Sequence, residues 1–112
     1  MENSQPKINK NANDLIARYA KAMGHPTRIE ILRYLASLDS CFFGDIHNEL
    51  PIAKATVSQH LKELKDAGLI QGEIETPKVR YCICKDNWEE AKGIFNSFFS
   101  ECKSSVQCCE SK

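Results

Sequence analysis

The sequence has no long run of apolar residues and no excess of charge of either sign. Its 112 residues contain no apolar stretch near the ~18 residues of a membrane span and no signal-peptide pattern. We therefore predict a soluble, cytoplasmic chain that does not interact with membranes. Lys plus Arg and Asp plus Glu each number 15, so the net charge is zero. That balance excludes a general, strongly basic nucleic-acid binder.

The histidines do not cluster, whereas cysteine is plentiful for so short a chain. The three histidines, His25, His47 and His60, are scattered, and no cysteine has a histidine partner placed to activate it. This argues against an enzyme. The six cysteines should be reduced in the cytosol, which favours metal, metalloid or thiol redox chemistry over a disulfide scaffold.

Residues 52–70, IAKATVSQHLKELKDAGLI, are predicted to form the amphipathic helix around which the chain is organised. Val57, Leu61 and Leu64 recur at helical spacing and predict a buried stripe. Gly68 stands where a helix stop is expected. Hydroxyl and amide groups early in this helix could read base edges in DNA. The residues predicted to contact DNA are Lys54, Ala55, Thr56, Ser58, Gln59, His60 and Lys62.

The flanking segments turn this helix into a recognisable DNA-binding unit. Residues 44–50 predict a short helix and 51–53 a turn, which together with the longer helix make a helix-turn-helix. Residues 69–76 and 79–85 predict two strands of a β-hairpin, or wing. From residue 51 to residue 85 there are six basic and four acidic residues, a local charge of +2. The predicted phosphate contacts near the wing tip are Lys78 and Arg80.

Three further helices complete the predicted domain, at 13–23, 27–38 and 86–102. Pro26 suits the first turn of the second one, which places His25 near its N-cap. The last helix carries a broad aromatic stripe that so small a body cannot cover, which predicts a homodimer. The predicted dimer contacts are Leu15, Tyr19, Trp88, Phe95, Phe98 and Phe99. The predicted organisation is a flexible N-terminus (1–10), this domain (11–103) and a cysteine-bearing tail (104–112).

Three segments resemble the ArsR/SmtB repressors: MGHPTR followed by IEILRYL from residue 23, ATVSQHLKELKDAGLI from residue 55, and VRYCI from residue 79. The resemblance covers roughly residues 14–99. It implies a mainly α (α+β) fold, a dimeric winged helix-turn-helix in the order α-α-α-α-β-β-α. It also implies a homodimeric repressor that binds double-stranded operator DNA and leaves it when an inducer binds.

The sequence departs from two metal sites that members of this family carry. Where many relatives have a CVCDL-like cysteine pair, Phe42 and Gly44 stand here, so we interpret Cys41 as a small apolar residue. Relatives that bind zinc on the last helix carry an Asp-x-His motif, whereas here Asp86 opens a helix without histidine. We therefore do not expect zinc.

Three cysteines gather at the end of the chain, and they are the predicted metalloid ligands: Cys102, Cys108 and Cys109. Three thiolates without histidine suit trivalent arsenic or antimony, whereas zinc usually takes a fourth ligand. A straight helix would hold Cys102 and Cys109 about 10 Å apart, so it must end near 102 or 103, or the site must be shared across the dimer. Arsenite-responsive relatives carry cysteine clusters in this region, and the metalloid would act as an inducer.

Other interpretations of the thiols remain open. A redox or sulfide switch could pair Cys102 with Cys108 or Cys109, or Cys102 could simply pack. Cys82 and Cys84 share one face of a predicted strand and could chelate a metal, although no third ligand is evident nearby. A metal-binding protein without specific DNA binding is the alternative from a different functional class.

Overall fold

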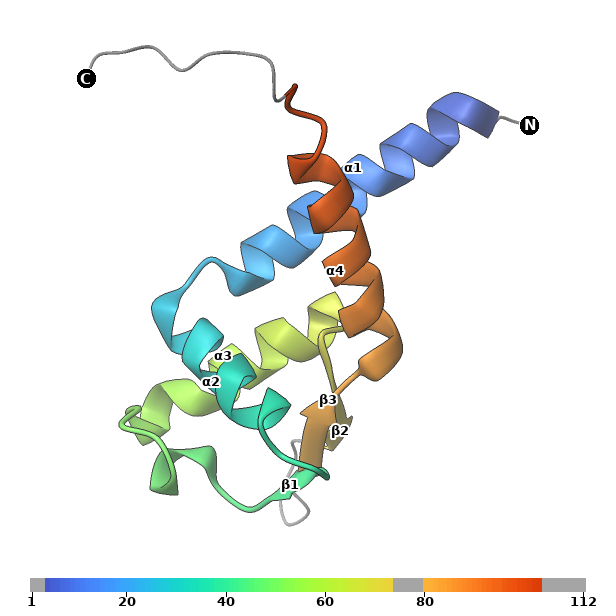
Figure 1. Ribbon diagram of the computed structural model, residues 1–112. Helices are drawn as coiled ribbons and strands as arrows, with labels where there is room; N and C mark the ends of the chain where they lie inside the picture. Colours follow the sequence, from blue (N-terminus) through green and yellow to red (C-terminus); the bar gives the residue numbers. More distant parts are fainter. Residues whose placement is uncertain (1–3, 74–79, 104–112) are drawn as a thin grey trace, which may run out of the picture.

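The computed structural model describes residues 4–73 and 80–103, and the side chains among them from residue 12 onward (Figure 1). Within these residues the chain folds into helices packed on one small antiparallel sheet. In chain order the elements are α1 (Ser4–Met23), α2 (Pro26–Ala36), β1 (Phe42–Phe43), the 3₁₀ helix η1 (Ile46–Asn48), α3 (Lys54–Ala67), β2 (Ile70–Glu73), β3 (Arg80–Ile83) and α4 (Lys85–Phe99). This is the predicted winged helix.

Helix ends follow from local chemistry that the sequence already showed. His25 is the N-cap of α2, and its Nδ1 accepts a hydrogen bond of 3.1 Å from the Thr27 backbone N–H. Pro26 occupies the first turn, where a backbone donor is not needed. Gly68 ends α3 in the left-handed region with φ 93°, so the predicted helix stop is confirmed.

The core is built from one side of each element. The predicted stripe of α3 is confirmed, because Val57, Leu61 and Leu64 are all buried. They pack with residues of α2, of the sheet and of η1. The fully buried side chains of this cluster are Ile31, Ile46, Leu61, Leu64, Leu69, Ile70 and Tyr81. Burial of this stripe on the body leaves the opposite side of α3 facing solvent.

Tyr19 joins α1 to α4 inside the protomer. It is 2 % exposed, and its hydroxyl donates to the Glu90 carboxylate at 2.8 Å. Burial, reinforced by the Glu90 carboxylate, raises the pKa of Tyr19 to about 12, so the hydroxyl keeps its proton and remains a donor. The structure thereby corrects the interface role predicted for Tyr19, since its side chain is already enclosed by its own chain.

The sheet contains one strand that the sequence analysis did not predict. Its order is β1-β3-β2, and both pairings are antiparallel. β2 and β3 form the predicted wing, with Ile70 opposite Ile83. The added strand, β1, pairs Phe42 with Tyr81 and Phe43 with Arg80. A two-residue strand is visible only once its partner strand is in place.

Several predicted boundaries are wrong. Helix α1 begins at Ser4 instead of residue 13, so most of the segment expected to be flexible is helical. The first helix of the helix-turn-helix is a single 3₁₀ turn instead of residues 44–50. Helix α4 ends at Phe99, three residues before the predicted end at Cys102. Among the described residues, no helix combines the length and apolar character needed to cross a membrane.

Candidate nucleic-acid interface and thiol sites

The solvent face of α3 presents most of the predicted DNA contacts. The exposed members of that set are Lys54, Ala55, Thr56, Ser58, Gln59 and Lys62. They follow the turn after η1 and lie on the side of α3 away from the buried stripe. The helix-turn-helix therefore offers a polar surface with one short and one longer helical element, the arrangement that enters a DNA major groove.

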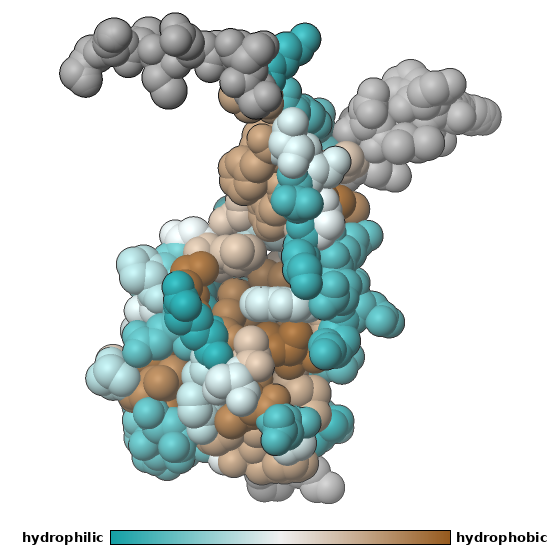
Figure 2. Space-filling view, viewed as in Figure 1, coloured by the Kyte–Doolittle hydropathy of each residue, from teal (hydrophilic) through white to brown (hydrophobic). Residues whose placement is uncertain are grey.

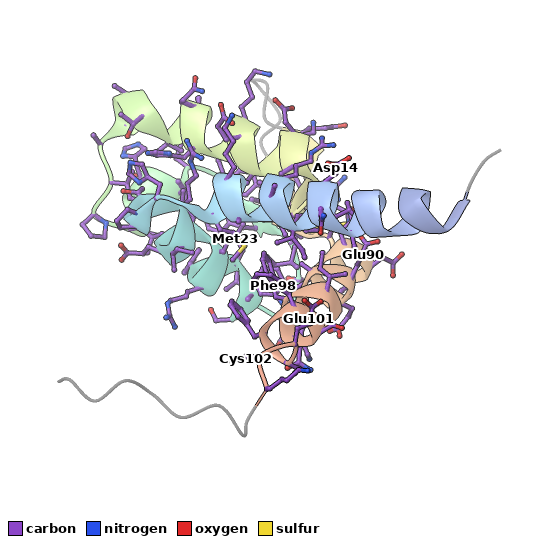
Figure 3. All side chains as sticks on the ribbon, turned by 90° about the horizontal axis from the view of Figure 1, so that it is seen from above. Asp14, Met23, Glu90, Phe98, Glu101 and Cys102 are labelled. Carbon is purple, nitrogen blue, oxygen red and sulfur yellow. A yellow bond between two sulfur atoms is a disulfide. The ribbon has the colours of Figure 1, made fainter. Side chains whose placement is uncertain are left out.

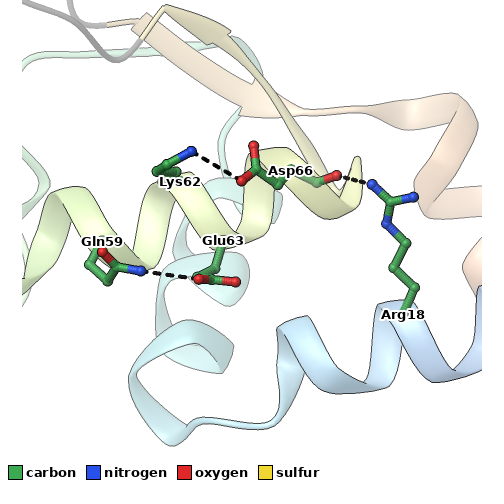
Figure 4. Close-up of polar contacts among 5 residues, drawn as sticks. All are labelled: Arg18, Gln59, Lys62, Glu63 and Asp66. Carbon is green, nitrogen blue, oxygen red and sulfur yellow. Dashed lines mark hydrogen bonds and ion pairs between the residues drawn. The ribbon is translucent and has the colours of Figure 1, made fainter.

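Polar side chains on this face are oriented by neighbours on the same helix. Gln59 Nε2 donates to Glu63 Oε2 at 3.0 Å, and Lys62 Nζ pairs with Asp66 Oδ2 at 3.2 Å (Figure 4). Thr56 Oγ1 donates to the Ala53 carbonyl at 3.0 Å. An exposed ion pair such as Lys62–Asp66 contributes little to stability. Lys62 is therefore free to exchange Asp66 for a phosphate.

The C-terminal end of α3 is held by α1. The Arg18 guanidinium donates to the backbone carbonyl of Asp66, in the last turn of α3 (Figure 4). A cation at the C-terminus of a helix meets unpaired carbonyls and the negative end of the helix dipole. Arg18 thus helps to fix the position of the C-terminal end of α3 relative to α1.

Arg28 and His60 hold the other half of α3 against the first two helices. Arg28 Nη1 donates to the Ala22 carbonyl at 3.2 Å, and Arg28 Nε donates to His60 Nδ1 at 3.1 Å. The rings of His25 and His60 lie 4.6 Å apart. The Arg28 guanidinium thus bridges α1 and α3.

The structure corrects the DNA contact predicted for His60. Its side chain is 8 % exposed and faces α2 instead of solvent. The sequence held the signal, because positions 57, 60, 61 and 64 follow the i, i+3, i+4, i+7 pattern of one helix face. Burial, with His25 and Arg28 adding to it, lowers the pKa of His60 below its usual value of 6.5. The neutral ring is the form that can accept the Arg28 hydrogen bond.

We expect folding stability to fall as the pH drops below about 6.5, because the unfolded chain then binds a proton that folded His60 resists. This contribution is fully present above the unfolded pKa of 6.5 and is lost as the pH falls toward the lower folded pKa. Urea unfolding midpoints at pH 7.5 and 5.5 measure the effect. The His60→Gln variant is the control and should lose less stability over the same interval. Equal losses in both proteins would show that other groups cause the pH dependence.

The wing places one of its two predicted phosphate contacts. Arg80 is exposed at the first position of β3, opposite Glu73 on one side and Phe43 on the other. Lys78 lies outside the described residues. Arg80 is therefore the cation that the described strands of the wing expose to solvent.

Cys102 lies just beyond α4, where the described chain ends (Figure 3). Its thiol is free and exposed. Because α4 stops at Phe99 with Ser100 as its C-cap, the chain can turn at Cys102, as a three-thiolate site within one chain requires. Cys108 and Cys109 lie outside the described residues. Within those residues, no group of three or more His, Cys, Asp or Glu side chains could hold a metal ion.

Cys41 and Cys82 form a disulfide, which corrects two predictions. The sequence predicts that all cysteines are reduced and that Cys41 is a small apolar residue. The β1–β3 pairing, which periodicity did not reveal, brings the two residues together. Cys84 follows β3 as the N-cap of α4, and its thiol is free. Because Cys82 is bonded to Cys41, it is not available to bind a metal together with Cys84.

An apolar surface remains uncovered along the last turns of α4 (Figure 2). Phe98 is 46 % and Phe99 69 % exposed, and their rings lie 5.3 Å apart. Phe98, Ile94 and Ile16 line a hollow of about 440 Å³ between α4 and α1. Phe98 lies alongside α1 in Figure 3. The other members of the predicted interface, Leu15, Trp88 and Phe95, are partly buried against the core of their own chain.

Comparison with known proteins agrees with this geometry. The family model described as "Bacterial regulatory protein, arsR family" matches residues 25–71, from the N-cap of α2 to β2. The chain is 34 % identical to the HTH-type transcriptional regulator CmtR of Mycobacterium tuberculosis over 79 residues, 70 % of this chain and 65 % of CmtR. It thus spans slightly less than two thirds of that relative.

An uncharacterized HTH-type transcriptional regulator of Methanocaldococcus jannaschii is 38 % identical over 74 residues, 66 % of this chain and 83 % of that protein. Among solved structures, the homodimeric winged helix-turn-helix DNA-binding domain of a possible ArsR-family regulator from Mycobacterium bovis superimposes with a TM-score of 0.60. Its sequence identity is 19 %, and the match covers 98 % of this chain and all of that domain. This structural match supports the fold.

Proposed function

The chain belongs to the arsR family of bacterial regulatory proteins, and we propose that it is a transcriptional repressor released from DNA by trivalent arsenic or antimony. In this proposal a homodimer binds a two-half-site operator on double-stranded DNA. Thiolates of Cys102, Cys108 and Cys109 bind the inducing ion. Regulatory function is also what the names of the relatives describe for those proteins.

The observation that carries the proposal is the solvent face of α3. Hydroxyl, amide and ammonium groups are exposed there, while the opposite side is fixed to the body by a buried stripe and by Arg18 and Arg28. Such a rigidly held polar helix can present donors and acceptors to base edges. Arg80 on the wing contacts the phosphate backbone of the DNA. Such a contact positions α3 on the duplex without reading the base sequence.

Dimerisation follows from the uncovered end of α4. Two exposed phenylalanines beside a hollow of mixed polar and apolar lining form a surface that a second copy of the same helix pair can cover. A symmetric pair places two recognition helices for successive half-sites. Because the net charge between residues 51 and 85 is only +2, the protein binds non-specific DNA weakly. Tight binding to the operator therefore needs both half-sites.

Induction is proposed to act through the end of α4. The interface residues Phe98 and Phe99 lie only a few positions before Cys102, so an ion bound at the tail pulls on the dimer interface itself. A shift of the half-site spacing weakens DNA binding. A difference of ~1–3 kcal/mol in ion affinity between the two states changes DNA affinity several-fold to a hundred-fold.

The test is fluorescence anisotropy of a labelled fragment from the gene's own promoter. Reduced protein is titrated onto the DNA, and arsenite, zinc or an oxidant is then added in separate experiments. We expect binding, followed by release with arsenite alone. The absence of binding at every protein concentration would overturn the repressor proposal.

Replacing Cys108 and Cys109 by serine should leave DNA binding intact and abolish release by arsenite, because one sulfur cannot hold the ion in a three-thiolate site. The same anisotropy titration measures both effects. Cys84→Ser is the matched control, since that thiol is free and sits at the other end of α4. If the double variant still releases DNA with arsenite, the tail is not the sensor.

A thiol redox or sulfide response is the second candidate function within the same fold. The exposed Cys102 thiol favours it, because an accessible thiol can form a disulfide with a tail cysteine without any metalloid. Release by an oxidant but not by arsenite would select this alternative. Ion binding without any specific DNA binding would instead select a metal-binding protein.

A further inference from the structure

The fold sets Cys41 and Cys82 directly opposite each other. Phe42 pairs with Tyr81 across β1 and β3; Cys41 immediately precedes Phe42, and Cys82 follows Tyr81 on β3. Their Cα atoms lie 4.4 Å apart, which is the separation of a non-hydrogen-bonded antiparallel pair and within the range that a disulfide spans. The backbone therefore needs no rearrangement to make or break this bond.

The bond closes a loop that contains the DNA-binding unit. Cys41 and Cys82 are 41 positions apart, and η1, α3 and β2 lie between them. β1 itself has only two residues and pairs with β3 alone. Apart from this pairing, the Phe42 ring holds it through contacts with Tyr34 and Tyr81, each with ring centroids 5.6 Å apart. The disulfide thus adds a strong tie between the wing and the start of the helix-turn-helix.

The pair is accessible to small reagents and lies among charged side chains of both signs. Both cysteines are partly exposed and line a surface hollow of about 370 Å³. Arg80 Nη1 lies 3.9 Å from Cys41 Sγ, and Lys85 lines the hollow, as do the carboxylates of Asp39 and Glu89. A small disulfide entering this hollow reaches both sulfurs, and the thiolate is the form that attacks it.

We propose that Cys41 and Cys82 are a reversible thiol switch, which a low-molecular-weight disulfide closes and which strengthens DNA binding when closed. This inference rests on the DNA binding proposed above, and it is separate from the tail thiols. Its strengthening effect follows from preorganisation. With the bond closed, Arg80 and the wing lose less conformational freedom when they meet a phosphate.

The chemistry is a pair of thiol–disulfide exchanges. The Cys41 thiolate attacks one sulfur of the small disulfide, whose S–S bond breaks and releases one thiolate. The Cys82 thiolate then attacks the Cys41 sulfur of the mixed disulfide and expels the second small thiolate. Two protein thiols are oxidised by two electrons, the reagent is reduced to two thiols, and these take up the two cysteine protons.

The experiment compares the full chain after dithiothreitol and after glutathione disulfide. Alkylation followed by peptide mass mapping identifies the bond. Thermal melting measures how much the bond stabilises the fold, and anisotropy on the promoter fragment measures DNA affinity. Cys41→Ser keeps every other thiol, including those of the tail, so tail oxidation affects it as it affects the wild type. Cys84→Ser is the matched control, because it removes the free cysteine nearest to the pair in sequence.

We expect a Cys41–Cys82 bond, a melting temperature at least ~5 °C higher and DNA affinity at least ~5-fold higher in the oxidised wild type and in Cys84→Ser. Cys41→Ser should show neither difference. The proposal is overturned if no such bond forms, if affinity stays equal or falls, or if Cys41→Ser responds equally. Peptide mapping and thermal melting need no DNA, so they test the bond independently of the repressor function. If the bond closes but the protein binds no promoter DNA in either state, the repressor function is refuted, and with it the effect of the switch on DNA binding.

Discussion

Replacing both Phe98 and Phe99 by serine is expected to give a monomer that binds the operator ~10²–10⁴-fold more weakly, because the second half-site no longer adds an intramolecular contact. Both side chains are substantially exposed in the protomer, at 46 % and 69 %. Their loss should therefore spare the fold. Sedimentation equilibrium measures the mass, and anisotropy measures the affinity for the promoter fragment.

Phe43→Ser is the matched control for this experiment. Phe43 is 68 % exposed, nearly the same as Phe99, but it lies on β1 at the opposite end of the molecule (Figure 1). We expect this variant to keep the mass of a dimer. A dimeric Phe98→Ser, Phe99→Ser double variant would show that the subunits meet through another surface.

Gly72→Ala is expected to lower the free energy of unfolding by about 3 kcal/mol or more, because the backbone at this position has no room for a side chain. Gly72 lies in β2 opposite Tyr81, with φ +133°. An added Cβ would overlap the Arg80 carbonyl oxygen and lie 2.7 Å from the Tyr81 Cα. Both neighbours are backbone atoms of the paired strand, so only separation of β2 from β3 relieves the overlap. Urea unfolding measures the loss.

Gly93→Ala makes the same chemical change, but we expect it to raise the free energy of unfolding. Gly93 lies inside α4, and nothing is within 4 Å of a Cβ added there. Alanine in an exposed helix interior should stabilise the protein by about 0.5–1 kcal/mol. If Gly72→Ala unfolds at the same urea concentration as the wild type, the wing does not contribute to the stability that the unfolding transition reports.

The recognition helix and the wing could be predicted from the sequence because their signals are local. Val57, Leu61 and Leu64 repeat at the helical period, and Gly68 marks the stop, so the structure confirmed both the buried stripe and the helix end. The cap at His25 was predictable for the same reason, because proline is favoured in the first turn of a helix. Family resemblance added the winged-helix topology, which the observed element order confirms.

Residues whose roles depend on distant partners were predicted less well. His60 appeared to be a polar contact for DNA, yet Arg28 and His25, more than 30 positions earlier, enclose it. Tyr19 looked like an interface residue until Glu90, 71 positions away, was found to accept its hydrogen bond. In both cases an amphipathic side chain could serve either surface or core, and only the packing partner decides between them.

By itself, the sequence determined the helical periods, the main turn and cap positions, the balance of charge and the clustering of thiols at the end of the chain. These properties depend on residues within a few positions of one another. Only the tertiary structure decided that β1 exists, that Cys41 meets Cys82, and that Phe98 and Phe99 remain uncovered. Each of these depends on contacts between segments far apart in the chain, and local periodicity carries no information about which segments meet.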